Sequence, residues 1–155
     1  MTVAEIMTTY PDALDAEASI RKAAQMMRDG DYGVVPITDE NGSLVGIVTD
    51  RDIVIKAVAD GQDLDDPIRD CMTQSPDSVA QDTSVEEAMR LMAKRQVRRL
   101  PVVENGRLIG MLSLGDIATS PESEHKKADT LAELSVNEET QQTTSSYSEE
   151  KLPGV

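Results

Sequence analysis

Apolar and polar positions along this chain predict a short helix and then five further elements within its first 60 residues. A short helix at 3–7 leads to a turn at Pro11, and apolar residues then recur at helical spacing after Ser19, a predicted N-cap. Two β-rich runs, 33–38 and 44–49, flank an Asn-Gly turn, which is typical of a β-hairpin. A second helix is expected from residue 50 to about residue 59. With a strand before the first long helix, the pattern predicts a β-α-β-β-α unit.

The same pattern occurs again about 65 residues later. A short helix is expected at 68–72, and Ser84 is the predicted N-cap of the next helix, with Glu87 completing a capping box. Strands at 99–103 and 108–113 flank a second Asn-Gly turn, and a short helix follows to about residue 119. Only two copies are present, so the repeat reads as a duplicated subdomain. We expect a mixed α/β (α+β) fold of two packed repeats related by pseudo-two-fold symmetry.

Length and composition define the expected domains. Two halves of this size bury a common core together, although either alone would be marginal. Phe and Trp are absent, so Val, Ile, Leu, Ala and the eight Met must build that core. We expect repeat 1 at 1–62, repeat 2 at 63–120, and an acidic, polar tail at 121–155 whose composition is that of a disordered segment.

Charge and residue content exclude several classes of function. A net charge of −14 repels nucleic acids and anionic membranes, so we expect neither as a partner. No apolar run is long enough to span a bilayer and no signal peptide is evident, which favours a cytoplasmic protein. One cysteine, Cys71, and one histidine, His125, are too few for a disulfide or a self-contained zinc site. With no placed nucleophile or base, we expect no enzyme and no catalytic residue.

The strand entries and strand ends carry a family resemblance. The runs VVPI and RRLPVV enter the first strand of each hairpin, and GIVTDRDI and GMLSLGDI close the second. These motifs, in correct order and twice over, resemble tandem cystathionine-β-synthase (CBS) domains. The resemblance implies a regulatory module without a required cofactor. Such a module commonly binds AMP, ADP, ATP, NAD or S-adenosylmethionine in the cleft between its halves, for example as an energy sensor.

Two polar pairs are the main candidates for ligand binding. Thr49 and Ser113 stand where a strand passes into a helix, where backbone N–H groups and the helix dipole favour a phosphate. Asp52 and Asp116 follow in the first helical turn, and the resemblance implies that they bind ribose hydroxyls. The same residues are also ordinary helix caps, so both interpretations stay open.

Arginines are the candidate phosphate ligands, because their guanidinium groups match phosphate oxygens. Arg98 and Arg99 belong to the only concentrated basic run and align with the His-Arg-apolar-Pro pattern in the γ subunits of AMP-activated protein kinase. Arg51 is a third candidate, but its counterpart in the second repeat is Gly115. The two sites are therefore expected to differ.

Adenine needs a flat apolar slot, which this chain must build without Phe or Trp. Tyr10 or Tyr32 could stack on the base instead. The residues expected around the base come from the proline turns and the strand entries: Thr8, Pro11, Val34, Thr73, Ser75, Pro76 and Val97.

Two functions compete at this stage. The first is a sensor of an adenosine-containing ligand, which changes how the module pairs with itself or with an effector protein. The second is a ligand-free structural dimer that acts through protein contacts. A homodimer is expected in either case, through helices with apolar faces at Ile53, Ile55, Val58 and Ile117.

Overall fold

The computed structural model describes residues 1–122, and the predicted disorder of the tail falls on residues that lie almost entirely outside this range. Met1–Asp116 forms one compact unit, and the described residues from 117 to 122 fall outside it. Both predicted repeats lie in this unit, apart from the last turns of the second. No helix in the described range is long and apolar enough to cross a membrane.

The elements of the first repeat follow the predicted order. They are η1 (a 3-10 helix, Val3–Glu5), β1 (Thr8–Thr9), β2 (Leu14–Asp15), α1 (Ile20–Gly30), β3 (Val34–Thr38), β4 (Leu44–Thr49), α2 (Asp50–Asp52) and η2 (Ile53–Val58). The single helix expected after β4 is instead a short α-helical turn that continues as a π-helix.

The second repeat has nearly the same order. Its elements are η3 (a 3-10 helix, Ile68–Asp70), β5 (Thr73–Gln74), β6 (Val79–Ala80), α3 (Val85–Arg95), β7 (Arg99–Glu104), β8 (Arg107–Ser113) and α4 (Leu114–Ala118). The mixed α+β fold and the duplicated unit are confirmed.

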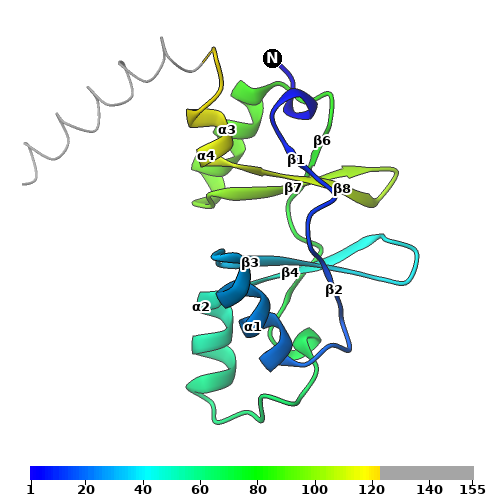
Figure 1. Ribbon diagram of the computed structural model, residues 1–155, viewed down its shortest axis with the longest axis vertical. Coiled ribbons are helices and arrows are strands. Elements are labelled where there is room, and N and C mark those ends of the chain that lie inside the picture. The colour runs from blue at the N-terminus through cyan, green and yellow to red at the C-terminus, as the bar shows by residue number, and fades with distance from the viewer. Residues whose placement is uncertain (123–155) are drawn as a thin grey trace, which may run out of the picture. The chain divides into compact units, whose positions relative to one another are not determined.

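In each of the two four-stranded sheets, one edge strand comes from the other repeat. The first sheet has the order β2-β3-β4-β5 and the second has the order β1-β8-β7-β6 (Figure 1). Thus β1, at the start of the chain, pairs with β8, placing Thr8 opposite Met111. In the same way β5 pairs with β4 and places Gln74 opposite Gly46. The sequence pattern did not predict that the repeats exchange β1 and β5. Because of this exchange, each sheet contains strands from both repeats.

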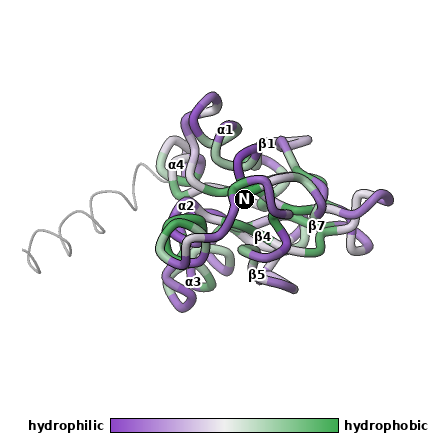
Figure 2. Tube along the Cα trace, turned by 90° about the horizontal axis from the view of Figure 1, so that it is seen from below, coloured by the Kyte–Doolittle hydropathy of each residue, from purple (hydrophilic) through white to green (hydrophobic). Residues whose placement is uncertain are grey.

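The cores consist of aliphatic and sulfur-containing side chains, as the composition requires. In the first repeat, α1, β3, β4 and η2 contribute a buried cluster, which also receives Ile68 and Cys71 from the other repeat. In the second, Ala88 and Met92 of α3 are buried, as are Leu100, Val102 and Leu112 of the sheet. Figure 2 shows hydrophobic stretches of the tube in green and hydrophilic outer loops in purple.

Serine caps start both long helices. Ser19 Oγ accepts a hydrogen bond from the Lys22 backbone N–H at 3.0 Å, and Ser84 Oγ accepts one from Glu87 at 3.2 Å. Both predicted N-caps are confirmed. The predicted capping box at Ser84 is only half formed within the described residues, because Glu87 contributes its backbone N–H and not its carboxylate. Glu87 is exposed and is one of the residues that line a groove between β6 and α3.

The tips of the two hairpins pair with each other. Ser43 and Arg107 form an antiparallel bridge between the repeats. Leu44 donates its backbone N–H to the Gly106 carbonyl at 2.9 Å, and Leu108 donates to Gly42 at 3.0 Å. Gly42 and Gly106 both have φ of +79°, a left-handed conformation that costs glycine least. These symmetric bonds hold the hairpins of the two repeats together.

Of the four apolar residues expected on the dimer face, two are exposed and two are buried. Ile53 and Ile117 are buried in the fold, so they cannot belong to an exposed apolar face. Ile55 and Val58 are exposed, and so is Val54, which the sequence pattern did not single out. The helical turns that follow the α2 label are accordingly hydrophobic in Figure 2.

Candidate functional site

Strand pairing places predicted site residues at the open end of each hairpin, away from its Asn-Gly turn. Val34 at the start of β3 lies opposite Thr49 at the end of β4, and Arg99 lies opposite Ser113 in the second repeat. Thr73 of β5 pairs with β4, and Thr8 of β1 pairs with β8. Each candidate site is therefore built from one hairpin and from the proline-turn segment of the other repeat.

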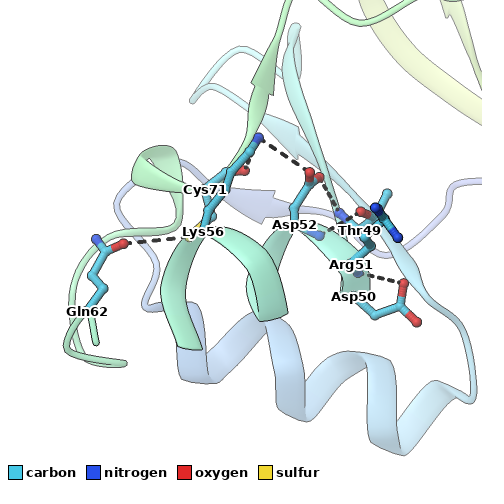
Figure 3. Close-up of polar contacts among 7 residues, drawn as sticks. All are labelled: Thr49, Asp50, Arg51, Asp52, Lys56, Gln62 and Cys71. Atoms are coloured by element: carbon cyan, nitrogen blue, oxygen red, sulfur yellow. Dashed lines mark hydrogen bonds and ion pairs between the residues drawn. The ribbon is translucent and has the colours of Figure 1, made fainter. Parts of the chain in front are cut away.

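In the first site, Thr49 and Asp52 form a complete capping box (Figure 3). The Asp52 N–H donates to Thr49 Oγ1 at 3.0 Å, and the Thr49 N–H donates to Asp52 Oδ2 at 2.9 Å. The Asp52 side chain is 19% exposed, so its carboxylate is oriented by the protein and still reaches solvent. The cap interpretation is thus confirmed for this pair, and it fixes the carboxylate that the family resemblance assigns to ribose.

The second site repeats this arrangement. The Asp116 N–H donates to Ser113 Oγ at 3.0 Å, and the Ser113 N–H donates to Asp116 Oδ2 at 2.9 Å. Both residues are half-buried. The two repeats therefore present the same hydroxyl–carboxylate pair in the same hydrogen-bonding pattern.

The backbone N–H groups expected to hold phosphate in the first site already have partners. Asp50 N–H donates to the Gly33 carbonyl at 2.9 Å, and Arg51 N–H donates to the Asp50 carboxylate at 2.9 Å. Asp52 N–H is taken by Thr49. In the second site, Leu114 N–H likewise donates to the Arg98 carbonyl at 2.9 Å. Hydrogen bonds within the protein therefore already occupy these backbone N–H groups.

The candidate arginines have unequal environments. Arg51 and Arg98 are exposed, while Arg99 is half-buried opposite Ser113. Within residues 1–122 none of the three guanidinium groups forms an ion pair. They are available to an anion, and Arg99 is the one whose position in the sheet is fixed beside a predicted ligand hydroxyl.

Lys56 belongs to the first site and was missed by the sequence analysis. Its Nζ lies 3.3 Å from Asp52 Oδ1 and donates to the Cys71 carbonyl at 3.2 Å (Figure 3). The i,i+4 spacing of an acidic and a basic residue was the available signal for the ion pair. The contact with Cys71, fifteen residues further on, had no signal in the sequence.

The residues expected around adenine lie in the two proline-turn segments and just before or at the start of β3 and β7. Tyr10 and Ser75, at equivalent positions of the proline turns, both have φ of +48°. Tyr10 is 90% exposed, and Tyr32 is half-buried with its hydroxyl 3.4 Å from Asp12 Oδ2. Pro11, Val34 and Pro76 are half-buried and Val97 is exposed. Burial thus makes Pro11, Val34 and Pro76 better candidates for an apolar slot than Val97.

Neither a metal site nor a reactive thiol is found in the described part of the chain. Residues 1–122 contain no group of three or more His, Cys, Asp or Glu side chains placed to hold a metal ion. Cys71 is fully buried, and burial together with nearby Asp70 raises the pKa of its thiol. A groove of about 460 Å³ between β6 and α3, lined by Thr83, Arg90 and Lys94 among others, contains none of the candidate residues.

Comparisons with known proteins agree with this architecture. A family model described as the CBS domain matches residues 3–58 and 68–122. The uncharacterized protein YlbB of Bacillus subtilis is 39% identical over 137 residues, covering 86% of this chain and 90% of that protein.

Two similar solved structures contain adenosine ligands. CBSX2 in complex with AMP has a TM-score of 0.67 at 28% identity, covering 76% of this chain and 93% of that one. The CBS domain pair of protein MJ0100, in complex with 5′-methylthioadenosine and S-adenosylmethionine, has a TM-score of 0.69 at 30% identity, covering 76% and 97%.

Proposed function

The chain belongs to the CBS-domain family, and we propose that it is a non-catalytic regulatory module that binds an adenosine-containing ligand at its duplicated sites. The ligand class is AMP, ADP or ATP, with NAD and S-adenosylmethionine as further members. Ligand binding changes how the module pairs with a second copy or with an effector protein. The module acts in the cytoplasm and needs no cofactor for this role.

The observation that carries the proposal is the duplicated hydroxyl–carboxylate pair. A ribose diol has two neighbouring O–H donors, and an ionised carboxylate has about four acceptor positions. In each site one oxygen, Asp52 Oδ2 or Asp116 Oδ2, accepts a backbone N–H, which orients the group before a ligand arrives. At Asp52, acceptor positions beyond the bonds from Thr49 and Lys56 suit a diol, and two similar structures do bind adenosine compounds.

The phosphate side of the ligand depends on side chains. Because hydrogen bonds within the protein occupy the N–H groups of Arg51 and Asp116 at the helix starts, Arg99 in the second site and Arg51 in the first are the proposed phosphate ligands, through their guanidinium groups. Arg98 is an exposed further donor. Arg99 is half-buried and Arg51 is exposed, so we expect stronger phosphate binding in the second site.

A structural dimer without a ligand is the second candidate. It is favoured by exposed apolar side chains at Val54, Ile55 and Val58 on η2, which a second copy would cover. The position of Arg51 is occupied by Gly115 in the second repeat, which also weakens the case for two equivalent ligand sites. The two candidates share the dimer and differ in whether a ligand binds.

A thermal-shift panel of AMP, ADP, ATP, NAD and S-adenosylmethionine tests the proposal, with GMP and ribose 5-phosphate as controls. A ligand at about 100 times its Kd stabilises the folded state by roughly 2.7 kcal/mol, which raises Tm by several degrees in a domain of this size. We expect such a shift with at least one adenosine compound and a smaller one with the controls. No shift with any adenosine compound would favour the structural dimer.

A further inference from the structure

Lys56 joins two parts of the first site that are far apart in the sequence. Its ammonium group lies between the carboxylate of Asp52 and the backbone carbonyl of Cys71, at 3.3 Å and 3.2 Å (Figure 3). We propose that Lys56 is a positioning residue, which holds the ribose-binding carboxylate and the inter-repeat segment at Cys71 in a fixed relation. Its effect on the ligand rests on the proposed function, whereas its effect on the segment does not.

On the carboxylate side, Lys56 completes the orientation of Asp52. The Thr49 N–H holds Oδ2 and the Lys56 ammonium holds Oδ1, so each oxygen has one partner. Since a carboxylate has about four acceptor positions, two are left for the hydroxyls of a diol. The Asp52 side chain is 19% exposed and that of Lys56 is 42% exposed, so water screens the pair only in part. The ion pair limits the rotation of the carboxylate.

On the segment side, Lys56 fixes the chain just before β5. Cys71 is the C-cap of η3, and only Met72 separates it from Thr73, the first residue of β5. The Lys56 ammonium donates a hydrogen bond to the Cys71 carbonyl. Gln62 lies on the other side, 3.9 Å from Cys71 Sγ, and donates to Asp70 at 2.8 Å. Lys56 and Gln62 thus hold from two directions the segment that leads to Thr73, Ser75 and Pro76.

The second repeat has a different residue at the position of Lys56. Asp52 corresponds to Asp116 at an offset of 64 residues, and at the same offset Lys56 corresponds to Ser120. A serine hydroxyl carries no charge, so Ser120 cannot form the ion pair that Lys56 forms with Asp52. The two sites therefore differ at this position, in addition to the difference between Arg51 and Gly115.

The segment effect is measured without any ligand through Cys71, the only cysteine of the chain. Cys71 is fully buried, so its rate of labelling by a maleimide under native conditions reports local opening of this segment. Lys56→Met keeps the apolar stem and removes the charge, Lys56→Arg keeps the charge, and Lys22→Met on the exposed face of α1 is the matched control.

We expect Lys56→Met to label roughly threefold to tenfold faster than the parent, since a charge-assisted hydrogen bond is lost at a partly exposed site. Lys56→Arg and Lys22→Met should label at about the parent rate. If Lys56→Met labels no faster than the parent, the positioning role is wrong. Should Lys56→Met not fold, as judged by circular dichroism, Lys56→Gln takes its place under the same criterion.

The ligand effect is measured by calorimetric titration with AMP. Lys56→Met should weaken AMP binding at the first site roughly threefold to tenfold, and Lys56→Arg should restore it. In an Asp52→Asn background, Lys56→Met should cause a smaller further loss, because the two residues act together. Full additivity would overturn the action through Asp52. If the parent does not bind AMP or any other adenosine compound, the proposed function fails, and Cys71 labelling alone then decides the role of Lys56.

Discussion

Replacing Gly46 by alanine should disturb the pairing of β4, in the first repeat, with β5, which comes from the second repeat. A Cβ atom at Gly46 would lie 2.5 Å from Met72 Sδ and 3.1 Å from both Met72 Cγ and the Thr73 carbonyl oxygen. The methionine side chain can move, but Thr73 is held in register opposite Ile47. Overpacking of this kind costs about 1–3 kcal/mol. At roughly 4 °C per kcal/mol for a domain of this size, Tm should fall by about 4–12 °C.

The assay is thermal unfolding of the single and double variants. Met72→Ala removes the side chain that the new methyl group would strike, so the double variant should lose less stability than the sum of the two single changes. Gly42→Ala is the matched control, because a Cβ there meets no atom within 4 Å and its cost of about 1 kcal/mol comes from φ of +79° alone. The reasoning is refuted if Gly46→Ala unfolds within a degree of the parent, or if the effects of Gly46→Ala and Met72→Ala simply add.

Three further predictions concern other parts of the molecule. Gly110→Ala should resemble Gly46→Ala in thermal unfolding, because its Cβ would lie 2.5 Å from Met7 Sδ and 3.0 Å from the Thr8 carbonyl oxygen; a variant as stable as the parent would contradict this. Burial raises the pKa of the Cys71 thiol above its ordinary 9.0, so the unfolded chain loses its thiol proton first. Stability should therefore decrease as the pH rises above 9, and Tm should fall less steeply in Cys71→Ala. Because Tyr32, whose pKa is also raised, is present in both proteins, equal slopes would contradict the role of Cys71. Light scattering at tens of micromolar should give a dimer mass for the parent and a monomer mass for Val58→Glu, whose side chain replaces an exposed apolar one; a monomeric parent would contradict the dimer.

Local signals in the sequence were sufficient to predict most of the elements. The Asn-Gly turns at Asn41 and Asn105 located both hairpins, and Ser19 and Ser84 marked the starts of both long helices. These features depend on a few neighbouring residues, so periodicity and capping rules apply to them directly. The position of Thr49 and Asp52 at a strand–helix junction was predictable for the same reason.

Contacts between distant segments could not be predicted in this way. Strands of two residues, such as β1 and β5, carry too little pattern to show which sheet they join. The contact of Lys56 with the Cys71 carbonyl depends on that exchange, and so does the approach of Met72 to Gly46. The helix-start N–H groups were expected to be available for phosphate. That expectation failed at Arg51, whose N–H is capped by Asp50, the residue immediately before it.

The central claim is most directly tested by calorimetric titration of AMP into the parent, Asp52→Ala and Asp116→Ala. Glu5→Ala is the control, because it removes a similar capping contact, from the Thr2 N–H at 2.6 Å, outside the candidate residues. The parent should bind AMP, and each aspartate variant should weaken binding at its own site by roughly 1.5–3 kcal/mol, or about tenfold to a hundredfold. Glu5→Ala should leave the affinity unchanged. The claim is contradicted if the parent binds no adenosine compound, or if both aspartate variants bind AMP as tightly as the parent does.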